Sequence, residues 1–205
     1  MVSLIEEINK QREEHIITIE DPIEFVFTPQ KSIFSQREVG RDTESFVTAI
    51  RAAMREDPNI VMVGEMRDAE TVNAALNLAE TGHLVFSTLH TSGSVQTISR
   101  IVQFFDPSTQ VQARIRLADS LIGVLSQRLV PRQDKPGRIA IRELMFVNSG
   151  IKNMIKMGDL KQVKSTIELG MQEGMITLEK SAEILEQHGM IKKEDYIGYL
   201  SADDM

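Results

Sequence analysis

Short, mostly apolar runs alternate with helical periods of apolar residues in the first part of the chain. The runs cover residues 15–19, 60–63 and 83–90, and each is followed by turn-forming or polar residues. Between them, apolar positions recur at helical spacing over 46–54 and 72–79. A short apolar run closed by turn residues is typical of a strand buried on both faces. Strands that alternate with helices in this way predict an α/β fold with a mostly parallel sheet.

The ends of these periods predict where helices begin. Apolar residues at 4, 5 and 8 mark a helix that is already under way at Met1. Asp42 or Thr43 is expected to cap the helix over 46–54, and Asp68 is expected to cap the next one. Residues 25–41 alternate only weakly between polar and apolar positions, which predicts a surface loop or a hairpin.

The second half of the chain changes character. A short helix is predicted from Val95 and a longer one after Pro107, followed by two strands over 127–130 and 138–147. From Asn148 the pattern is helical throughout, with breaks at glycines. We therefore expect a core domain over residues 1–147 and a small C-terminal helical subdomain over residues 148–205.

Composition narrows the range of functions. The chain has 205 residues, a formal net charge of -7 and a pI near 5.2, which argue against nucleic acid as the main partner because phosphate binding needs a basic face. It has no cysteine, which excludes disulfides and thiolate zinc sites. No apolar run approaches the roughly 20 residues of a membrane span, and the first residues lack the basic start of a signal peptide. We expect a soluble protein of the cell interior.

Polar residues gather where the predicted strands end. Glu20 and Asp21 follow the first strand, Glu65 follows the second, and the stretch 83–90, with two histidines and Thr88, forms the third. The carboxyl ends of parallel strands meet at one edge of a sheet, and ligands bind there. Carboxylates clustered in this way suit Mg²⁺ that is shared with substrate phosphates. Each group alone also fits a structural role, as a turn, a strand end or a packed histidine, but together they favour a nucleotide or metal site.

Three segments of the chain, in this order, resemble motifs of one ATPase family. Residues 17–24 (Ile-Thr-Ile-Glu-Asp-Pro-Ile-Glu) are similar to its Asp box, 61–68 (Val-Met-Val-Gly-Glu-Met-Arg-Asp) to its Walker B motif, and 79–91 to its His box. The chain thereby resembles the PilT-type ATPases that retract type IV pili, within the wider family of type II and type IV secretion ATPases. The resemblance implies a RecA-like core, a homo-hexamer, and ATP hydrolysis that powers pilus retraction and twitching motility. It also implies a place at the cytoplasmic face of the inner-membrane pilus platform, without nucleic acid.

The resemblance assigns a role to each matching residue. Glu65 would be the Walker B glutamate that polarises the attacking water, and Glu20 and Asp21 would act on Mg²⁺ directly or through its waters. The residues that would sense or stabilise the γ-phosphate of ATP are His83, Thr88 and His90. This division is physically reasonable because phosphoryl transfer depends mostly on positioning and on stabilisation of charge.

One motif of the family is missing from the sequence. A P-loop needs a Gly-Lys pair followed by Ser or Thr, and the chain contains no Gly-Lys pair. The resemblance implies that the chain corresponds to the C-terminal part of such an ATPase and begins inside the helix that follows the P-loop. Since the P-loop strand lies inside a RecA-like sheet, its absence is expected to leave unpaired strand edges or to make neighbouring strands close up. We expect the isolated chain to have low stability and no ATPase activity.

Two further features bear on the branch of the family. Where retraction members carry an Ala-Ile-Arg-Asn-Leu-Ile-Arg-Glu motif, residues 150–157 read Gly-Ile-Lys-Asn-Met-Ile-Lys-Met. Lysine cannot reproduce a bidentate guanidinium contact, so coupling through this segment is in question. Assembly and type II secretion members commonly carry a tetracysteine zinc site, so the absence of cysteine favours retraction.

Three other functions stay open at this point. The chain can be a non-hydrolysing interaction subunit that has kept the fold, or a type II secretion or pilus assembly ATPase without its zinc module. A DNA-packaging or conjugation relative with a RecA-like core is a third alternative. An in-frame P-loop motif in the coding DNA upstream of Met1 would favour the motor over the interaction subunit.

Overall fold

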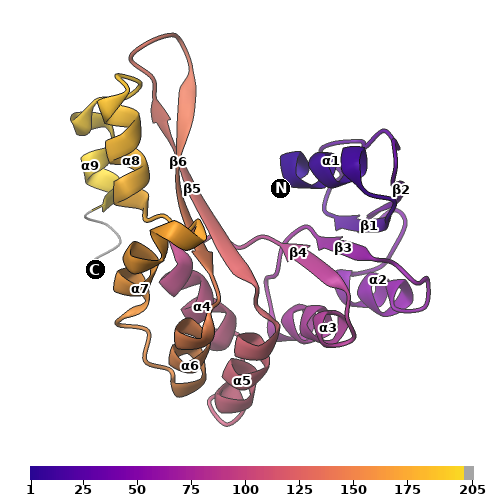
Figure 1. Cartoon of the computed structure of the whole chain (residues 1–205). Coiled ribbons are helices and arrows are strands. Elements are labelled where there is room, and N and C mark those ends of the chain that lie inside the picture. The colour runs from indigo at the N-terminus through magenta and orange to yellow at the C-terminus, as the bar shows by residue number, and fades with distance from the viewer. Residues whose placement is uncertain (201–205) are drawn as a thin grey trace. The chain divides into compact units, whose positions relative to one another are not determined.

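The computed structural model describes residues 1–200 (Figure 1). These residues form two compact units, the first unit over Met1–Leu89 and the second unit from His90 onward. Each unit has its own sheet. The boundary after residue 147, between the predicted core domain and the predicted helical subdomain, differs from this division and stays a prediction.

The first unit alternates helices and strands, as predicted. Its elements are α1 (Val2–Gln11), β1 (His15–Glu20), β2 (Ile33–Glu38), α2 (Phe46–Ala53), β3 (Ile60–Val63), α3 (Ala69–Glu80) and β4 (Leu84–Ser87). The strands form one sheet in the order β2-β1-β3-β4, and every neighbouring pair is parallel. The predicted α/β fold with a parallel sheet is therefore confirmed for this unit.

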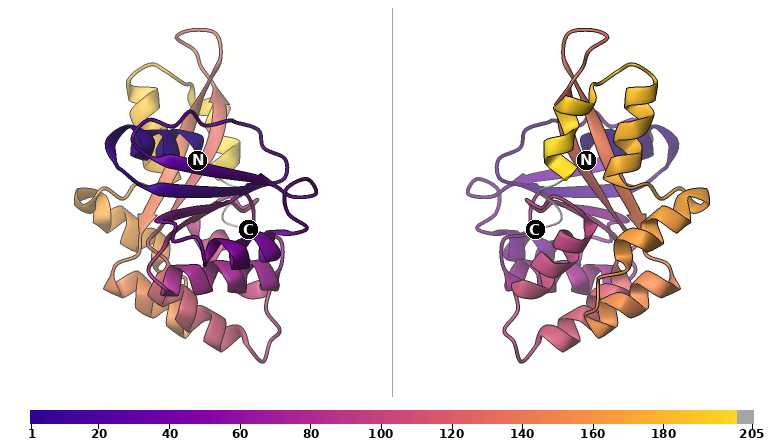
Figure 2. Two further views of the ribbon diagram at one scale, coloured as in Figure 1. Left: turned by 90° about the vertical axis from the view of Figure 1, so that its right-hand side faces the viewer. Right: turned by 90° about the vertical axis from the view of Figure 1, so that its left-hand side faces the viewer.

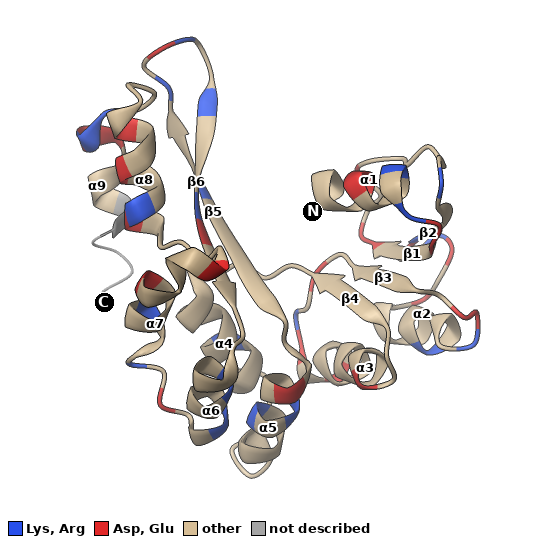
Figure 3. Cartoon of the chain, viewed as in Figure 1, with Lys and Arg blue, Asp and Glu red and all other residues tan. Residues whose placement is uncertain are grey.

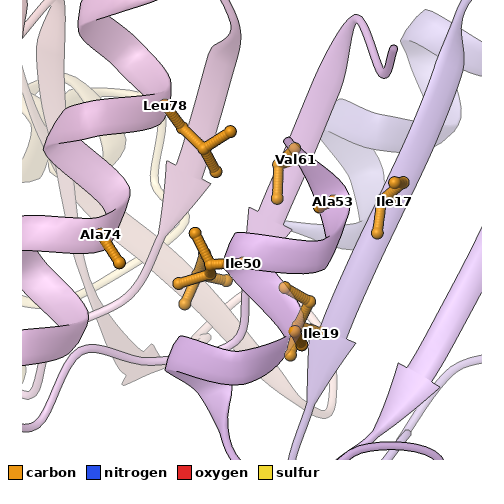
Figure 4. Close-up of a cluster of buried hydrophobic side chains, with 9 residues drawn as sticks. Ile17, Ile19, Ile50, Ala53, Val61, Ala74 and Leu78 are labelled. Carbon is orange, nitrogen blue, oxygen red and sulfur yellow. The ribbon is translucent and has the colours of Figure 1, made fainter. Parts of the chain in front are cut away.

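Both faces of this sheet are covered, which explains why the inner strands β1 and β3 are mostly apolar. Figures 1 and 2 show α1 on one face and α2 with α3 on the other. Ile17 and Ile19 of β1 pack with Ile50 of α2 and Leu78 of α3 (Figure 4), and all four side chains are fully buried. Ile16, the residue between these two in β1, packs against Ile5 of α1 on the other face. Each such side chain contributes about 1.5–3 kcal/mol by its burial.

Two predictions for the first unit are wrong. Residues 33–38 are not part of a loop or hairpin but form β2, which pairs in parallel with β1 at the edge of the sheet. The alternation of polar and apolar residues in β2 is weak because several of its side chains are polar and bind neighbouring loops. The helix α2 is capped by Ser45, whose Oγ accepts a hydrogen bond from the backbone N–H of Thr48 (3.1 Å), and not by Asp42 or Thr43. The predicted cap at Asp68 is confirmed by a 2.8 Å bond from the N–H of Thr71.

The second unit begins with two helices and a long antiparallel hairpin. Its elements are α4 (Ser94–Gln103), α5 (Gln110–Ser120), β5 (Gly123–Pro131), β6 (Arg138–Phe146), α6 (Ser149–Met157), α7 (Val163–Leu169), the 3₁₀ helix Gly170–Glu173, α8 (Leu178–Gln187) and α9 (Lys193–Leu200). The predicted strand pair is confirmed, although β5 begins four residues before the predicted start at Gln127. The segment after Asn148 is helical, as predicted.

The helices α8 and α9 pack beside the hairpin (Figure 2). Val130 and Ile141 of the hairpin are buried against Leu178 and Ala182 of α8. Acidic and basic residues are interspersed along α8 (Figure 3), and Lys180 pairs with Glu183 at 3.0 Å. The hairpin and the C-terminal helices thus share one hydrophobic core.

Candidate functional site

The carboxyl ends of all four strands of the first unit lie at one edge of its sheet, because every pair is parallel. Glu20 ends β1, Gly64 and Glu65 follow β3, and Thr88 follows β4. On β2, Glu38 is the register partner of Glu20. The structure therefore brings the predicted carboxylates of the Asp box and the Walker B segment to the same edge.

Glu20 is held in place within this edge. Its side chain is only 8% exposed, and its Oε1 accepts hydrogen bonds from Thr18 Oγ1 (2.7 Å) and from Gln36 Nε2 (3.2 Å). Thr18 is fully buried. A buried carboxylate needs such donors to offset the loss of water. Two fixed donors on the same oxygen also limit the conformations of the side chain.

Gly64 allows the backbone before Glu65 to lie directly against the end of β1. A Cβ atom at this position would lie 3.1 Å from the carbonyl oxygen of Ile19 and 3.4 Å from the Cα of Glu20. The N–H of Gly64 donates to the same carbonyl of Ile19 at 2.8 Å. On the other side, Thr88 Oγ1 donates to the carbonyl oxygen of Gly64 at 2.5 Å. Thr88 therefore supports the backbone that positions Glu65.

Arg67 pairs with two carboxylates of the edge, those of Glu65 and Asp21. Its Nη2 binds Glu65 Oε1 at 2.5 Å, and its Nη1 lies 3.9 Å from Asp21 Oδ2. The hydrogen bond with Glu65 raises the pKa of Arg67 above its ordinary value, so the guanidinium stays charged. The Glu65 side chain is 17% exposed and that of Asp21 is 43% exposed, so both remain accessible.

The donor set fits Mg²⁺ only if the ion is shared with another ligand. Within residues 1–200, no group of three carboxylate or imidazole side chains is close enough to hold a metal ion. Mg²⁺ takes oxygen ligands and commonly binds one or two carboxylates together with waters and substrate phosphates. Glu20 and Asp21 supply such oxygens at one strand end. The residues fit a metal that a nucleotide brings with it, and they do not fit an all-protein cage.

His83 lies at the opposite end of the sheet from the carboxylates. It precedes β4, and its Nδ1 lies 3.0 Å from the carbonyl oxygen of Leu78 and 3.1 Å from Thr81 Oγ1. It borders a polar hollow of about 450 Å³ that Arg12 and Asn59 also line. The structure therefore does not bring His83 together with Glu20 and Glu65 in the first unit. The predicted run 83–90 already had His83 as its first residue, so the direction of the strand alone indicated this end of the sheet.

His90 is the first residue of the second unit, and it is exposed. The loop that follows it is held by Thr97, whose Oγ1 lies 2.7 Å from Thr91 Oγ1 and 2.8 Å from the carbonyl oxygen of Gly93. The N–H of Ser94 donates to Glu143 Oε1 of β6 at 2.7 Å. Glu143 thus caps the helix that follows this loop, which the sequence did not indicate. The phosphate-sensing roles of His83, Thr88 and His90 stay predictions.

Three supporting residues of the first unit were also missed: Thr18, Gln36 and Arg67. The contact of Thr18 with Glu20 could have been predicted, because the two residues are two apart in one strand and therefore share a face of the sheet. Gln36 was not, because its contact with Glu20 depends on the parallel register of a strand that the pattern did not predict.

Comparison with known proteins finds similarity to secretion and pilus proteins. The family model described as type II/IV secretion system protein matches residues 1–187. The chain is 43% identical over 194 residues to the twitching motility protein of Neisseria gonorrhoeae, a match that covers 95% of this chain and 52% of the relative. It is also 43% identical to the type IV pilus retraction ATPase PilT of Pseudomonas aeruginosa, with 95% of this chain and 56% of the relative covered.

Solved structures give the same result. The crystal structure of the pilus retraction motor PilT with bound ADP matches with a TM-score of 0.88 and 47% identity, and the match covers 97% of this chain and 56% of the other. The Legionella pneumophila ATPase DotB matches with a TM-score of 0.85 and 31% identity, covering 98% of this chain and 55% of the other. The chain spans about half the length of these relatives.

Proposed function

This chain belongs to the type II/IV secretion system protein family, and we propose that it is part of an ATP-hydrolysing motor that retracts type IV pili and so supports twitching motility. The observation that carries the proposal is the gathering of Glu20, Asp21 and Glu65 at one edge of an all-parallel sheet. The retraction relatives are 43% identical over 95% of the chain, against 31% identity for DotB, which supports retraction over the other activities of the family.

Each residue of the edge has a distinct task in this proposal. Glu65 accepts a hydrogen bond from the attacking water and directs its lone pair toward the γ-phosphate. Glu20, fixed by Thr18, and the more exposed Asp21 orient the waters of the bound Mg²⁺. The metal supplies positive charge that neutralises the phosphate oxygens. Arg67 pairs with both Glu65 and Asp21, and its positive charge reduces the repulsion between the two carboxylates. These tasks consist of positioning and charge stabilisation, as phosphoryl transfer requires.

Assembly and location are part of the same proposal. We propose a homo-hexamer that acts at the cytoplasmic face of the inner-membrane pilus platform. Over residues 1–200, no helix combines the length and the apolarity that a bilayer crossing requires. Co-purification of a hexamer with platform proteins from cells would support this arrangement, and retention on DNA would instead favour a DNA-packaging or conjugation role.

The first experiment tests the role of Glu65. It uses an extended polypeptide, in which the chain follows a segment that supplies a P-loop, taken from its own upstream reading frame or from the P. aeruginosa relative. We expect Glu65→Gln to leave ATP binding within about twofold and to lower kcat about a hundredfold or more, because a positioned base typically contributes that much. Steady-state phosphate release measures kcat, and filter binding measures ATP affinity.

A matched control is Glu70→Gln on α3, whose side chain is 67% exposed and pairs with Arg51 at the surface. This variant should hydrolyse ATP at the unmodified rate. Near-normal turnover in Glu65→Gln would contradict the role proposed for Glu65.

A second experiment concerns the 205-residue chain by itself. Because its sequence has no Gly-Lys pair to hold phosphates, we expect the isolated chain to show no magnesium-dependent ATP turnover above a heat-treated sample. Turnover that disappears on addition of a chelator would show that this expectation is wrong. If the upstream reading frame encodes no P-loop, a non-hydrolysing interaction subunit becomes the better assignment.

A further inference from the structure

Gln36 lies beside Glu20 because of the parallel register of β1 and β2. Thr18 is paired with Gln36, and Glu20 is paired with Glu38. Paired residues of neighbouring strands project on the same face of a sheet, and residues two apart in a strand do so as well. Thr18, Glu20 and Gln36 therefore share one face and converge on one carboxylate.

The two oxygens of Glu20 are not equivalent. Oε1 accepts both hydrogen bonds, from Thr18 at 2.7 Å and from Gln36 at 3.2 Å. Two donors fill the acceptor capacity of that oxygen. Within residues 1–200, no donor contacts Oε2 of this buried side chain. The oxygen left for a ligand is thus Oε2 alone.

The side-chain amide of Gln36 is fixed in orientation by its other contacts. Its Oε1 accepts a hydrogen bond from the backbone N–H of Phe27 at 2.8 Å, and its Nε2 donates to the carbonyl oxygen of Phe25 at 2.9 Å. Rotating the amide by half a turn would place a donor against the N–H of Phe27 and an acceptor against both Phe25 and Glu20. Only the observed orientation satisfies all three partners, so Gln36 always presents a donor to Glu20.

We propose that Gln36 is a positioning residue for Glu20, which it holds so that Oε2 alone faces the magnesium waters of bound ATP. The inference rests on the proposed function. Removing a hydrogen-bond partner that orients a metal-binding carboxylate typically lowers activity or metal affinity by about 10–100-fold. Gln36 contacts neither the metal nor the substrate in this assignment, and it acts only through Glu20.

Two variants of Gln36 separate this role from a role in anchoring the loop around Phe27. Gln36→Met removes every hydrogen bond of the side chain. Gln36→Glu keeps the acceptor for the N–H of Phe27 but loses the Nε2 donor, which binds both Glu20 and the carbonyl oxygen of Phe25. In the extended polypeptide we expect both to lower kcat about tenfold or more, with KM for ATP within about twofold. Gln30→Met and Gln30→Glu, at an exposed position of the same unit, are the matched controls and should be unchanged.

The pH profile gives a readout that a purely structural role would not move. As the pH falls, the carboxyl introduced by Gln36→Glu takes up a proton and can again donate to Glu20. The kcat of this variant relative to the unmodified protein should therefore rise toward acid pH, while the ratio for Gln36→Met should not rise, because methionine has no proton to regain. The titratable groups near position 36, which are Glu20 on β1, Glu38 on β2 and Glu24 in the adjoining loop, are common to all the proteins compared.

A second measurement does not depend on ATP hydrolysis. In the 205-residue chain with ¹⁵N-labelled glutamine, the side-chain amide protons of Gln36 should exchange slowly and should shift on Glu20→Ala. They should not respond to Glu70→Gln, which lies far from them in sequence and on the surface. This arm tests the hydrogen bond even if the extended polypeptide is inactive.

The outcomes distinguish the inference from the proposed function. If the unmodified extended polypeptide hydrolyses ATP and Gln36→Glu does so equally well, Gln36 only anchors the loop and the inference is wrong. If the Gln36 amide protons ignore Glu20→Ala, the inference is wrong whatever the activity. If the unmodified polypeptide is inactive while the amide protons respond to Glu20→Ala, the proposed function fails and the contact between the two side chains stands.

Discussion

At the scale of single residues, Gly64 is the glycine of the first unit with the least room for a side chain. A Cβ atom there would meet backbone atoms, 3.1 Å from Ile19 O and 3.4 Å from Glu20 Cα, and backbone cannot rotate away as a side chain can. We expect Gly64→Ala to destabilise the chain by about 1–3 kcal/mol, the usual cost of overpacking. Urea denaturation measures this. Gly198→Ala is the control, since a Cβ there meets nothing within 4 Å, and equal stabilities of the two variants would contradict the argument.

The same scale shows what the sequence could and could not reveal about the site. Glu20 and Glu65 were found because each directly follows an apolar run, and the end of a strand is visible in the pattern. Gln36 and Arg67 were not found, because a supporting residue is defined by its distance from another side chain. His83 was grouped with the carboxylates, although it precedes its strand and so lies at the other end of the sheet. Position in sequence thus indicates the strand end, but not the contacts made there.

At the scale of elements, α4 depends on a residue from another element. Its N-cap is Gly93, which has no side chain to bind the free N–H groups, and Glu143 of β6 takes that role at 2.7 Å from Ser94 N. We expect Glu143→Ala to lower the free energy of unfolding by about 1 kcal/mol, as for other lost caps. Glu143→Gln should cost less, because it keeps an acceptor and loses only the charge.

Hydrogen exchange of the Ser94 amide, together with urea denaturation, checks this expectation. The exchange rate should rise in Glu143→Ala and much less in Glu143→Gln. Equal rates in all three proteins would mean that Glu143 does not cap α4 in solution.

A second element-scale expectation concerns α5 and α6. Asp119 Oδ1 accepts hydrogen bonds from Lys152 (2.7 Å) and Lys156 (2.9 Å), the two lysines that stand where the retraction motif has arginines. These bonds hold the pKa of Asp119 below its ordinary value. A lowered pKa stabilises the folded state above the ordinary value of about 4 and ceases to do so as the pH falls through the folded value.

Asp119→Asn should therefore be less stable than the unmodified chain at neutral pH, and the difference should shrink as the pH is lowered below about 4. Urea denaturation at several pH values measures the difference. A difference that does not change with pH would show that the carboxylate charge does not stabilise the contact between α5 and α6.

The elements themselves were predictable where burial dictates the pattern. The strands β1 and β3 are covered on both faces, so their apolar runs are continuous, and the helices were visible from their spacing. The edge strand β2 was missed because its outer positions serve neighbouring segments. Glu38 binds the N–H of Ile23 at 3.0 Å, and Arg37 binds Glu56 at 2.7 Å. Such polar side chains are typical of loops as well as of edge strands.

At the scale of the whole molecule, the two units have separate sheets and separate hydrophobic clusters. We expect their unfolding transitions not to coincide, because two-state behaviour belongs to a single cooperative core. The chain offers a convenient probe, since it has two tyrosines, at positions 196 and 199, and no tryptophan. Tyrosine fluorescence reports only the second unit, whereas circular dichroism reports both. Superimposable urea curves from the two probes would contradict independent unfolding.

The parallel register of the first unit also bears on how sequence variation should be read. Because β1 to β4 all run the same way, positions far apart in the chain meet at one rim, and the opposite rim is made by the residues that begin the same strands. A saturation mutagenesis screen for pilus retraction should therefore show narrow intolerant windows at the last residues of each strand. Substitutions at the first residues of those strands should be tolerated unless they impair folding. If substitutions of His83 abolish retraction without impairing folding, His83 acts in the site despite its place at the other end of the sheet. If they are tolerated, it has no role in the site.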